Sequence, residues 1–218
     1  MNEQKGDDKV KYIVKSVEPG LFVSWKTSNP NATYNDLSDP NDANARAAKQ
    51  ALKDALLKEQ KYLCCYCECR IDDSTSHIEH FKPKAQDKFP DLQLEYSNLH
   101  ASCTKRPTGK PDEHCGHKKS DVYSNDLVSP LEHDCSIHFQ YMLNGTIVGA
   151  DNRGKTTIAT LKLNSALLDI QRRTLIDYFS DFDGEDLELE ITSHLDSTKS
   201  KYGEFYSMIE YLHEQHLL

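Results

Sequence analysis

Hydrophobic and polar positions follow several patterns near the amino-terminal end of the chain, and each pattern predicts a different element. Residues 10–15, VKYIVK, alternate apolar and polar side chains as a short strand does. Residues 19–25, PGLFVSW, predict a turn and a second strand. Residues 27–43 are rich in Asn, Asp, Ser and Pro, which is typical of a loop. Two short strands and a loop are therefore expected before the first helix.

The first helix is expected to begin near residue 39. Asp39 can cap it, and Pro40 suits its first position. Apolar side chains then recur at helical spacing through AAKQALKDALLKEQKYL. These positions are Ala48, Leu52, Ala55, Leu56 and Leu63. This helix is expected to run directly into a cluster of cysteines.

Later patterns predict a hairpin and two further helices. FQYMLNGTIVG, from residue 139, should form a hairpin that turns at Asn144-Gly145. NSALLDIQRRTLIDYF should form a helix, and the segment after Lys201 should present another helical face. The apolar positions of these helices are Leu168, Ile170, Leu175, Ile176 and Phe179, then Tyr202, Phe205, Ile209 and Leu212. Strands and helices together predict an α+β fold.

Composition limits the size of the core and the class of protein. The chain has 218 residues, of which 37% are hydrophobic, enough for one ordinary domain or a small module with flanking supports. No apolar run approaches the roughly 20 residues that span a bilayer. The first residues are charged and lack the apolar region of a signal peptide. We therefore expect a soluble cytoplasmic protein.

Charge is unevenly distributed, although the net charge is −9. Residues 77–119 hold eight Lys or Arg against six Asp or Glu, whereas residues 181–218 hold two against ten. A mildly basic centre suits local contact with nucleic acid. The acidic end is either a docking surface for a basic partner or an ordinary solvated face.

The cysteines indicate a metal site rather than a disulfide framework. There are seven, an odd number, and several lie close together in LCCYCECR. Cys64 and Cys67 form the C-x-x-C pair whose thiolates can bind one tetrahedral ion, and Cys103 and Cys115 supply the second pair. We therefore predict a structural zinc site. Three alternative ligands remain open: Cys65, Cys69 and His114.

The stretch SHIEHFKPK, residues 76–84, lies between the two halves of this cysteine set. In a strand, His77 and Glu79 would share one face, with Ile78 and His80 on the other. Twist or a bend could bring Glu79 and His80 around one ion. A carboxylate that binds a divalent cation and a histidine that activates water would together be able to hydrolyse a phosphodiester.

The order of these motifs resembles the HNH endonucleases, whose small ββα-metal core is often held by a four-cysteine zinc. LLKEQKYLCCYCE, IEHFKPK, EYSNLHASC, HCGHKKSD and KTTIATLKLNSALLDIQRR are most similar to the PtuB group. These are the nuclease subunits of Septu-type and retron-linked anti-phage defence systems. The resemblance runs from about residue 48 to residue 180. It implies an HNH core at 62–124, a supporting region at 1–61 and a carboxy-terminal hairpin and helical region at 125–218.

The resemblance also implies roles for single residues. His80 would be the general base, Glu79 a ligand of the catalytic divalent ion, and Asn98 the residue that holds the loop between the strands and orients His80. His117 would be the second ligand, displaced by one position because Gly116 directly follows the last cysteine. His77 is expected to have a structural role beside this ion, which we expect to be Mg²⁺ or Mn²⁺.

Basic residues near this stretch are expected to contact the nucleic-acid backbone. They are Lys82, Lys84, Lys105, Arg106 and Lys119. By resemblance, the partners would be a PtuA-like ATPase subunit and, in a retron-linked system, the reverse transcriptase with its DNA and RNA. The alternative hypothesis is a zinc-stapled adaptor that binds nucleic acid without cutting it. The sequence does not separate DNA from RNA as the substrate.

Overall fold

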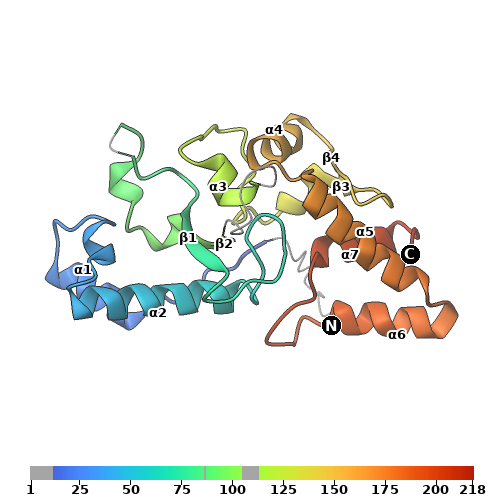
Figure 1. Ribbon diagram of the computed structural model, residues 1–218, viewed down its shortest axis with the longest axis horizontal. Helices are drawn as coiled ribbons and strands as arrows, with labels where there is room; N and C mark the ends of the chain where they lie inside the picture. The colour runs from blue at the N-terminus through green and yellow to red at the C-terminus, as the bar shows by residue number, and fades with distance from the viewer. Residues whose placement is uncertain (1–11, 86, 105–112) are drawn as a thin grey trace, which may run out of the picture.

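The computed structural model describes residues 12–85, 87–104 and 113–218, and these form an α+β fold. Figure 1 shows two small two-stranded sheets among helices. The helices and strands are α1 (Gly20–Ser28), α2 (Ala43–Glu59), β1 (Ser76–His80), β2 (Leu99–Cys103), α3 (Cys115–Lys119), β3 (Phe139–Tyr141), β4 (Ile147–Gly149), α4 (Asn152–Leu161), α5 (Ala166–Ser180), α6 (Gly184–His194) and α7 (Tyr206–Glu214). Short 3₁₀ turns cover Asp36–Ser38, Pro90–Leu92, Tyr96–Asn98 and Cys135–His138.

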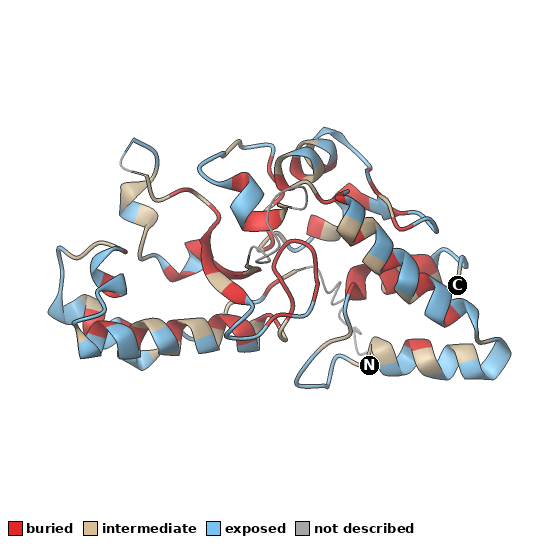
Figure 2. Cartoon of the chain, in the orientation of Figure 1, coloured by how far each residue is buried: buried red, intermediate tan, exposed pale blue. Residues whose placement is uncertain are grey.

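The central sheet pairs β1 with β2 in antiparallel register. Glu79 lies opposite His100, and His80 lies opposite Leu99. Helices α1 and α2 lie on one side of this sheet, α3 lies beside it, and α5, α6 and α7 occupy the other end of the molecule (Figure 1). Buried residues concentrate in the strands and in the cysteine-rich loop between α2 and β1 (Figure 2). The sheet is therefore held in the middle of the core.

The predicted strands before the first helix are wrong where the structure describes them. Residues 12–19 have no regular structure, and α1 replaces the strand predicted in PGLFVSW. Phe22 and Trp25 are the buried residues of α1, and their spacing of three is helical rather than alternating. Residues 10 and 11 of the other predicted strand lie outside the described residues.

The predicted start of α2 is also corrected by one turn. Asp42, not Asp39, caps the helix, because its carboxylate accepts hydrogen bonds from the backbone amides of Asn44 and Ala45. The Asp39 carboxylate instead accepts from the amide of Asn41 in the preceding turn. Leu52 and Leu56 on the buried face of α2 are fully enclosed, as the helical pattern predicted.

The carboxy-terminal hairpin and two helices are confirmed, except that α7 begins at Tyr206, so the predicted positions Tyr202 and Phe205 precede it, and two helices are added. β3 and β4 form the hairpin around Gly145, whose φ is +85°. Ser165 caps α5, which buries Leu168, Ile176 and Phe179, but Ile170 is 64% exposed and does not belong to the buried face. Helices α4 and α6 were not predicted from the sequence.

No helix within the described ranges is both long and apolar enough to cross a lipid bilayer.

Candidate active site and metal centre

Four cysteines from three segments converge at the edge of the central sheet. The sulfurs of Cys64, Cys67, Cys103 and Cys115 all lie within 4.8 Å of one another. The Cys67 and Cys103 sulfurs are 3.9 Å apart, close to the roughly 3.8 Å between thiolates around a tetrahedral zinc with 2.3 Å bonds. Hydrogen bonds from Cys103 and Cys115 hold the pKa of Cys67 well below its usual value. The four predicted ligands thus have the geometry of a structural zinc site.

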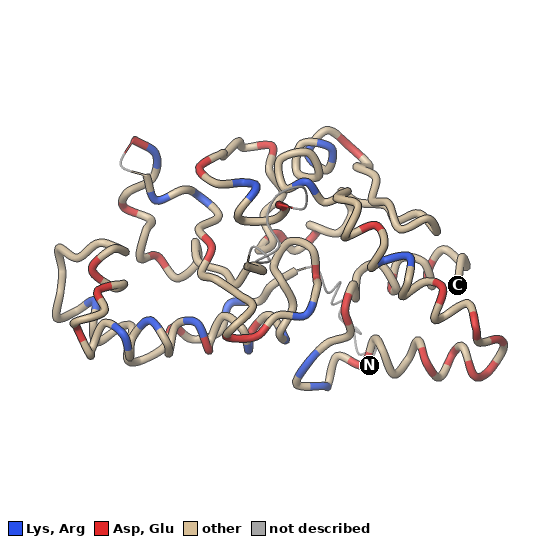
Figure 3. Tube along the Cα trace, viewed as in Figure 1, with Lys and Arg blue, Asp and Glu red and all other residues tan. Residues whose placement is uncertain are grey.

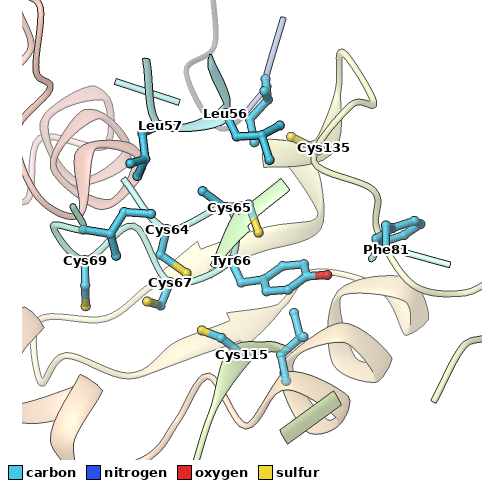
Figure 4. Packing of buried hydrophobic residues seen from close by; sticks show 14 of the residues in the cluster. Leu56, Leu57, Cys64, Cys65, Tyr66, Cys67, Cys69, Phe81, Cys115 and Cys135 are labelled. Atoms are coloured by element: carbon cyan, nitrogen blue, oxygen red, sulfur yellow. The ribbon is translucent and has the colours of Figure 1, made fainter. Parts of the chain in front are cut away.

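Two of the alternative ligands point elsewhere. In Figure 4 the sulfurs of Cys64, Cys67 and Cys115 point toward one another, whereas those of Cys65 and Cys69 point away. The Cys69 thiol instead lies 3.7 Å from the side-chain oxygen of Gln171.

The third alternative ligand, His114, lies at the rim of the thiol cluster. Its Nδ1 atom is 3.1 Å from the sulfur of Cys115 and 3.7 Å from that of Cys103. The imidazole therefore contacts two of the four thiols, but the four thiols form the cluster without it.

Glu79 lies on the face of β1 that meets α3, and it is 7% exposed. Its Oε1 atom accepts from the Lys119 ammonium at 2.9 Å and from the Tyr66 hydroxyl at 3.2 Å. Its Oε2 atom is 3.3 Å from Nε2 of His77. Burial raises the pKa of Glu79, but the hydrogen bond with His77 and the charge of Lys119 outweigh it. Glu79 is therefore ionised at neutral pH.

His80 lies on the opposite face of β1, beside Tyr34 and Gln93. Its Nε2 atom is 3.0 Å from the backbone oxygen of Gln93. Because a carbonyl only accepts, Nε2 carries the proton and Nδ1 of the neutral ring is left as a base. The Tyr34 ring packs edge-on against the imidazole, with centroids 4.6 Å apart. Burial, assisted by the charge of Lys84, lowers the pKa of His80 to about 4.

The Asn98 side chain joins three points of the loop between β1 and β2. Its Oδ1 atom accepts from the amide of Lys82 at 2.8 Å, and its Nδ2 group donates to the carbonyls of Lys82 and Leu92 at 2.9 and 3.0 Å. Leu92 directly precedes Gln93, the hydrogen-bond partner of His80. Asn98 therefore holds the backbone segment that contacts the His80 ring.

The short helix α3 brings His117 next to β1. The rings of His77 and His117 have centroids 4.5 Å apart, and His77 contacts Glu79. The structure thus places His117 beside His77 and His77 beside Glu79. Gly116 packs directly against Glu79 and His77. His80 lies on the other face of the strand, as its alternation predicted.

The predicted basic contacts fall into three groups. Lys82 and Lys84 are half-buried, and their ammonium groups lie over the rings of Phe89 and Tyr34, at 5.6 and 4.7 Å from the centroids. Lys119 is only 1% exposed, so its ammonium faces Glu79 and the backbone oxygen of His80 rather than solvent. Lys105 and Arg106 lie outside the described residues.

The sequence interpretation missed Tyr34, Gln93 and Tyr66 as neighbours of the site. Tyr34 and Gln93 are linked to each other by a hydrogen bond from the Tyr34 amide to the Gln93 side chain at 3.0 Å. Tyr66 lies inside the C-x-x-C pair, and this position was the one local signal that it would face the strand. The other two belong to loops without a recognisable pattern.

Comparison with known proteins identifies three named relatives, and no family model matches the chain. The chain is 36% identical over 125 residues to "Septu protein PtuB" of Bacillus thuringiensis, a match that covers 56% of this chain and 45% of PtuB. It is 33% identical over 140 residues to "Retron Vc95 putative HNH endonuclease" of Vibrio cholerae serotype O1 biovar El Tor, covering 61% of this chain and 66% of the relative.

The third relative is "Retron Ec83 putative HNH endonuclease" of Escherichia coli, 33% identical over 100 residues, or 43% of this chain and 37% of that protein. The chain thus spans less than half of the length of two of these relatives. Two of the three relatives are named putative HNH endonucleases, the family that the motif order indicates, and the third is named PtuB. The chain belongs to the HNH endonuclease family, near PtuB.

Proposed function

We propose that this chain is a metal-dependent HNH endonuclease that hydrolyses phosphodiester bonds of DNA or RNA. The observation that carries the proposal is that neighbouring positions of β1 hold a neutral His80, whose Nε2–H is held by Gln93, and an ionised Glu79 on the opposite face. In this proposal β1, β2 and α3 are the ββα-metal core at residues 62–124. The flanking regions 1–61 and 125–218 support it.

The chain's own residues divide the reaction between them. His80 takes a proton on Nδ1 from the water that attacks the phosphorus, while Gln93 keeps the ring oriented through Nε2. Glu79 and His117 hold the catalytic divalent ion, Mg²⁺ or Mn²⁺, which when bound would neutralise charge on the leaving oxygen. Asn98 holds the loop. Lys82 and Lys84, with Lys105 and Arg106, contact backbone phosphates.

The donor set near Glu79 fits such an ion. A carboxylate oxygen and an imidazole are ordinary ligands of divalent cations. A Cβ on residue 116 would lie 2.4 Å from Oε2 of Glu79, so glycine leaves space beside this oxygen. The half of the site near His117 is exposed, which leaves positions for water and phosphate.

A cleavage assay tests the proposal. The purified chain, with zinc content verified, is incubated with Mg²⁺ or Mn²⁺ and duplex DNA, single-stranded DNA, bulk RNA or tRNA, first alone and then with an ATPase partner. Cleavage should require the divalent ion and should fall by about 10²-fold or more in His80→Ala. His216→Ala, which removes an exposed histidine after α7, is the matched control. Absence of cleavage by a folded, zinc-loaded chain with its partner would leave the adaptor hypothesis.

We further propose that the nuclease acts as the effector subunit of an anti-phage system with a PtuA-like ATPase. The proposal is supported by the names of its relatives, which belong to Septu and retron systems. In a retron-linked system the reverse transcriptase and its nucleic acid would also take part. Co-expression with each candidate subunit, followed by size-exclusion chromatography, tests which of them binds.

Of the two candidate docking surfaces for that partner, the acidic one on α6 is better supported than the apolar face of α7. The apolar face of α7 is already buried, with Ile209 and Leu212 fully enclosed. Acidic residues instead recur along the trace of α6 (Figure 3), where Glu185, Asp186 and Glu188 are exposed. Exchange of Glu185 and Asp186 for lysine should therefore weaken association with the ATPase. The same exchange at the exposed Asp126 should not.

A further inference from the structure

Three potential metal ligands, rather than the two that the motif order implies, lie near the junction of β1 and α3, although among the described residues only the four cysteines have three or more ligand atoms within 4.8 Å of one another. His77 and Glu79 project from the same face of β1, because they are two residues apart in a strand. His117 projects from α3 onto His77, with its ring centroid 4.5 Å from that of His77. The third side chain, His77, was expected to have a structural or supporting role beside the ion.

We propose that His77 is a ligand of the catalytic ion, so that Glu79, His77 and His117 form a site of two histidines and one carboxylate. This inference rests on the proposed nuclease function. It also restricts which metal ion the site would select. Two imidazole nitrogens favour a transition-metal ion such as Mn²⁺ over Mg²⁺, which prefers an all-oxygen environment.

The spacing of the donor atoms supports a shared ion. Nε2 of His77 and Oε2 of Glu79 are 3.3 Å apart. Adjacent ligand atoms about 2.1 Å from one ion lie roughly 3.0 to 3.4 Å apart in octahedral or tetrahedral geometry. Nδ1 of His77 is buried without a hydrogen-bond partner in the described chain, so Nε2 is the nitrogen directed at the carboxylate.

The two oxygens of Glu79 are in different environments. Oε1 is engaged by Lys119 and Tyr66 on the buried side. Oε2 faces His77, whose Nε2 atom lies 3.3 Å away. One carboxylate can thus remain anchored through Oε1 while Oε2 binds the ion.

Gly116 gives a reason for the shift of His117 by one position. A Cβ at residue 116 would lie 2.4 Å from Oε2 of Glu79 and 2.8 Å from Nε2 of His77. Both atoms are proposed ligand atoms, and a Cβ would occupy the space between them and α3. A residue with a side chain cannot stand there while both are available. Glycine at position 116 therefore keeps the space beside Glu79 and His77 open, and the ligand from α3 comes one residue later, from His117.

The alternative for His77 is a simple ion pair with Glu79, and metal binding distinguishes the two. The experiment titrates the zinc-loaded full chain with Mn²⁺ and follows the loss of the free-ion signal by electron paramagnetic resonance. Electron spin-echo modulation then reports imidazole nitrogens bound to Mn²⁺. The variants are His77→Ala, His77→Gln, Glu79→Gln and the surface control His216→Ala. Circular dichroism and zinc content verify that each variant is folded.

The wild type and His216→Ala are expected to bind one Mn²⁺ beyond zinc, with modulation from two imidazoles and with tighter binding than Mg²⁺. Both His77 variants should bind Mn²⁺ at least about tenfold more weakly, since even loss of a group that supports a ligand costs that much. They should also lose one nitrogen coupling.

Wild-type affinity and unchanged nitrogen coupling in both His77 variants would overturn the proposal. If cleavage still required His80, the nuclease function would stand and only the third ligand would fall. A wild type that binds no Mn²⁺ and cleaves nothing with its partner would overturn both the ligand assignment and the nuclease proposal.

Discussion

Replacement of Asn98 by alanine should loosen the loop between β1 and β2 without disturbing the zinc cluster. The change removes three hydrogen bonds, to the amide and carbonyl of Lys82 and to the carbonyl of Leu92. A buried hydrogen bond contributes about 1 kcal/mol net, so the free energy of unfolding should fall by about 3 kcal/mol. Asn98 is 6% exposed, so water cannot easily replace the lost contacts.

The same change should reduce catalysis more than binding. Leu92 precedes Gln93, whose carbonyl holds the His80 ring, so release of this segment frees the imidazole to rotate. We expect kcat to fall by at least about tenfold, at a temperature where the variant is folded, because a misplaced general base loses part of its roughly 10²- to 10⁴-fold contribution. The substrate affinity should change less.

Urea denaturation followed by the fluorescence of Trp25, the single tryptophan, measures the stability change. Ser97→Ala is the matched control, because Ser97 is exposed and bonds only to the Glu95 side chain, so its loss should cost less than about 0.5 kcal/mol. A destabilisation of Asn98→Ala below about 1 kcal/mol would refute the reasoning, since the loop would then be held by other contacts.

Three other perturbations have defined outcomes. Gly116→Ala should abolish Mn²⁺ binding but retain zinc, measured by paramagnetic resonance and elemental analysis, because its Cβ would meet Glu79. Glu59→Gln should cost about 3 kcal/mol in urea denaturation, because it leaves the Lys15 ammonium without its buried partner at 2.6 Å. The value of kcat/KM should fall only as the pH approaches 4, and not already near 6.5, the ordinary pKa of histidine. The reason is that burial lowers the pKa of His80 to about 4 and only the unprotonated ring accepts a proton.

Local patterns predicted the elements that depend on neighbouring residues. The C-x-x-C pair, the Asn144-Gly145 turn and the Ser165-capped helix each carry their signal within a few residues. The strand predicted in PGLFVSW failed because its apolar positions lie close together in a short segment, which fits either period, and only Phe22 and Trp25 of them are buried. Helix α6 was missed because Ile191 is its one buried residue, so it has almost no apolar face.

The surroundings of the candidate site were less predictable because they depend on long-range packing. Alternation in β1 placed Glu79 and His80 on opposite faces. Nothing local indicated that Tyr34, from the loop before α2, would lie against His80. Nor did the sequence indicate that Lys119 would be buried on Glu79 rather than exposed to phosphate. Both contacts follow from how loops and helices close over the sheet.

The cysteine-rich loop also holds the carboxy-terminal end of the chain, although these regions were predicted as separate parts. Glu68, which follows Cys67, accepts hydrogen bonds from the amide and hydroxyl of Ser207 at 3.0 and 2.6 Å, in the first turn of α7. Its backbone oxygen accepts from the amide of Phe205 at 3.0 Å. The Arg70 amide donates to the side chain of Glu204 at 2.7 Å. A zinc ion bound by the four cysteines would hold this loop and should therefore also stabilise α7.

Removal of zinc should for this reason release α7 as well as the sheet. Cys103→Ser, or a chelator, removes a site whose binding free energy is of order 10 kcal/mol in small zinc modules. Hydrogen exchange should then show loss of protection in residues 205–214, which the loop contacts through Glu68. Glu68→Gln is the companion variant: it weakens the α7 contacts but retains zinc, so exchange should rise in α7 alone. Full protection of α7 after zinc removal would mean that packing by Ile209 and Leu212 holds the helix without the loop.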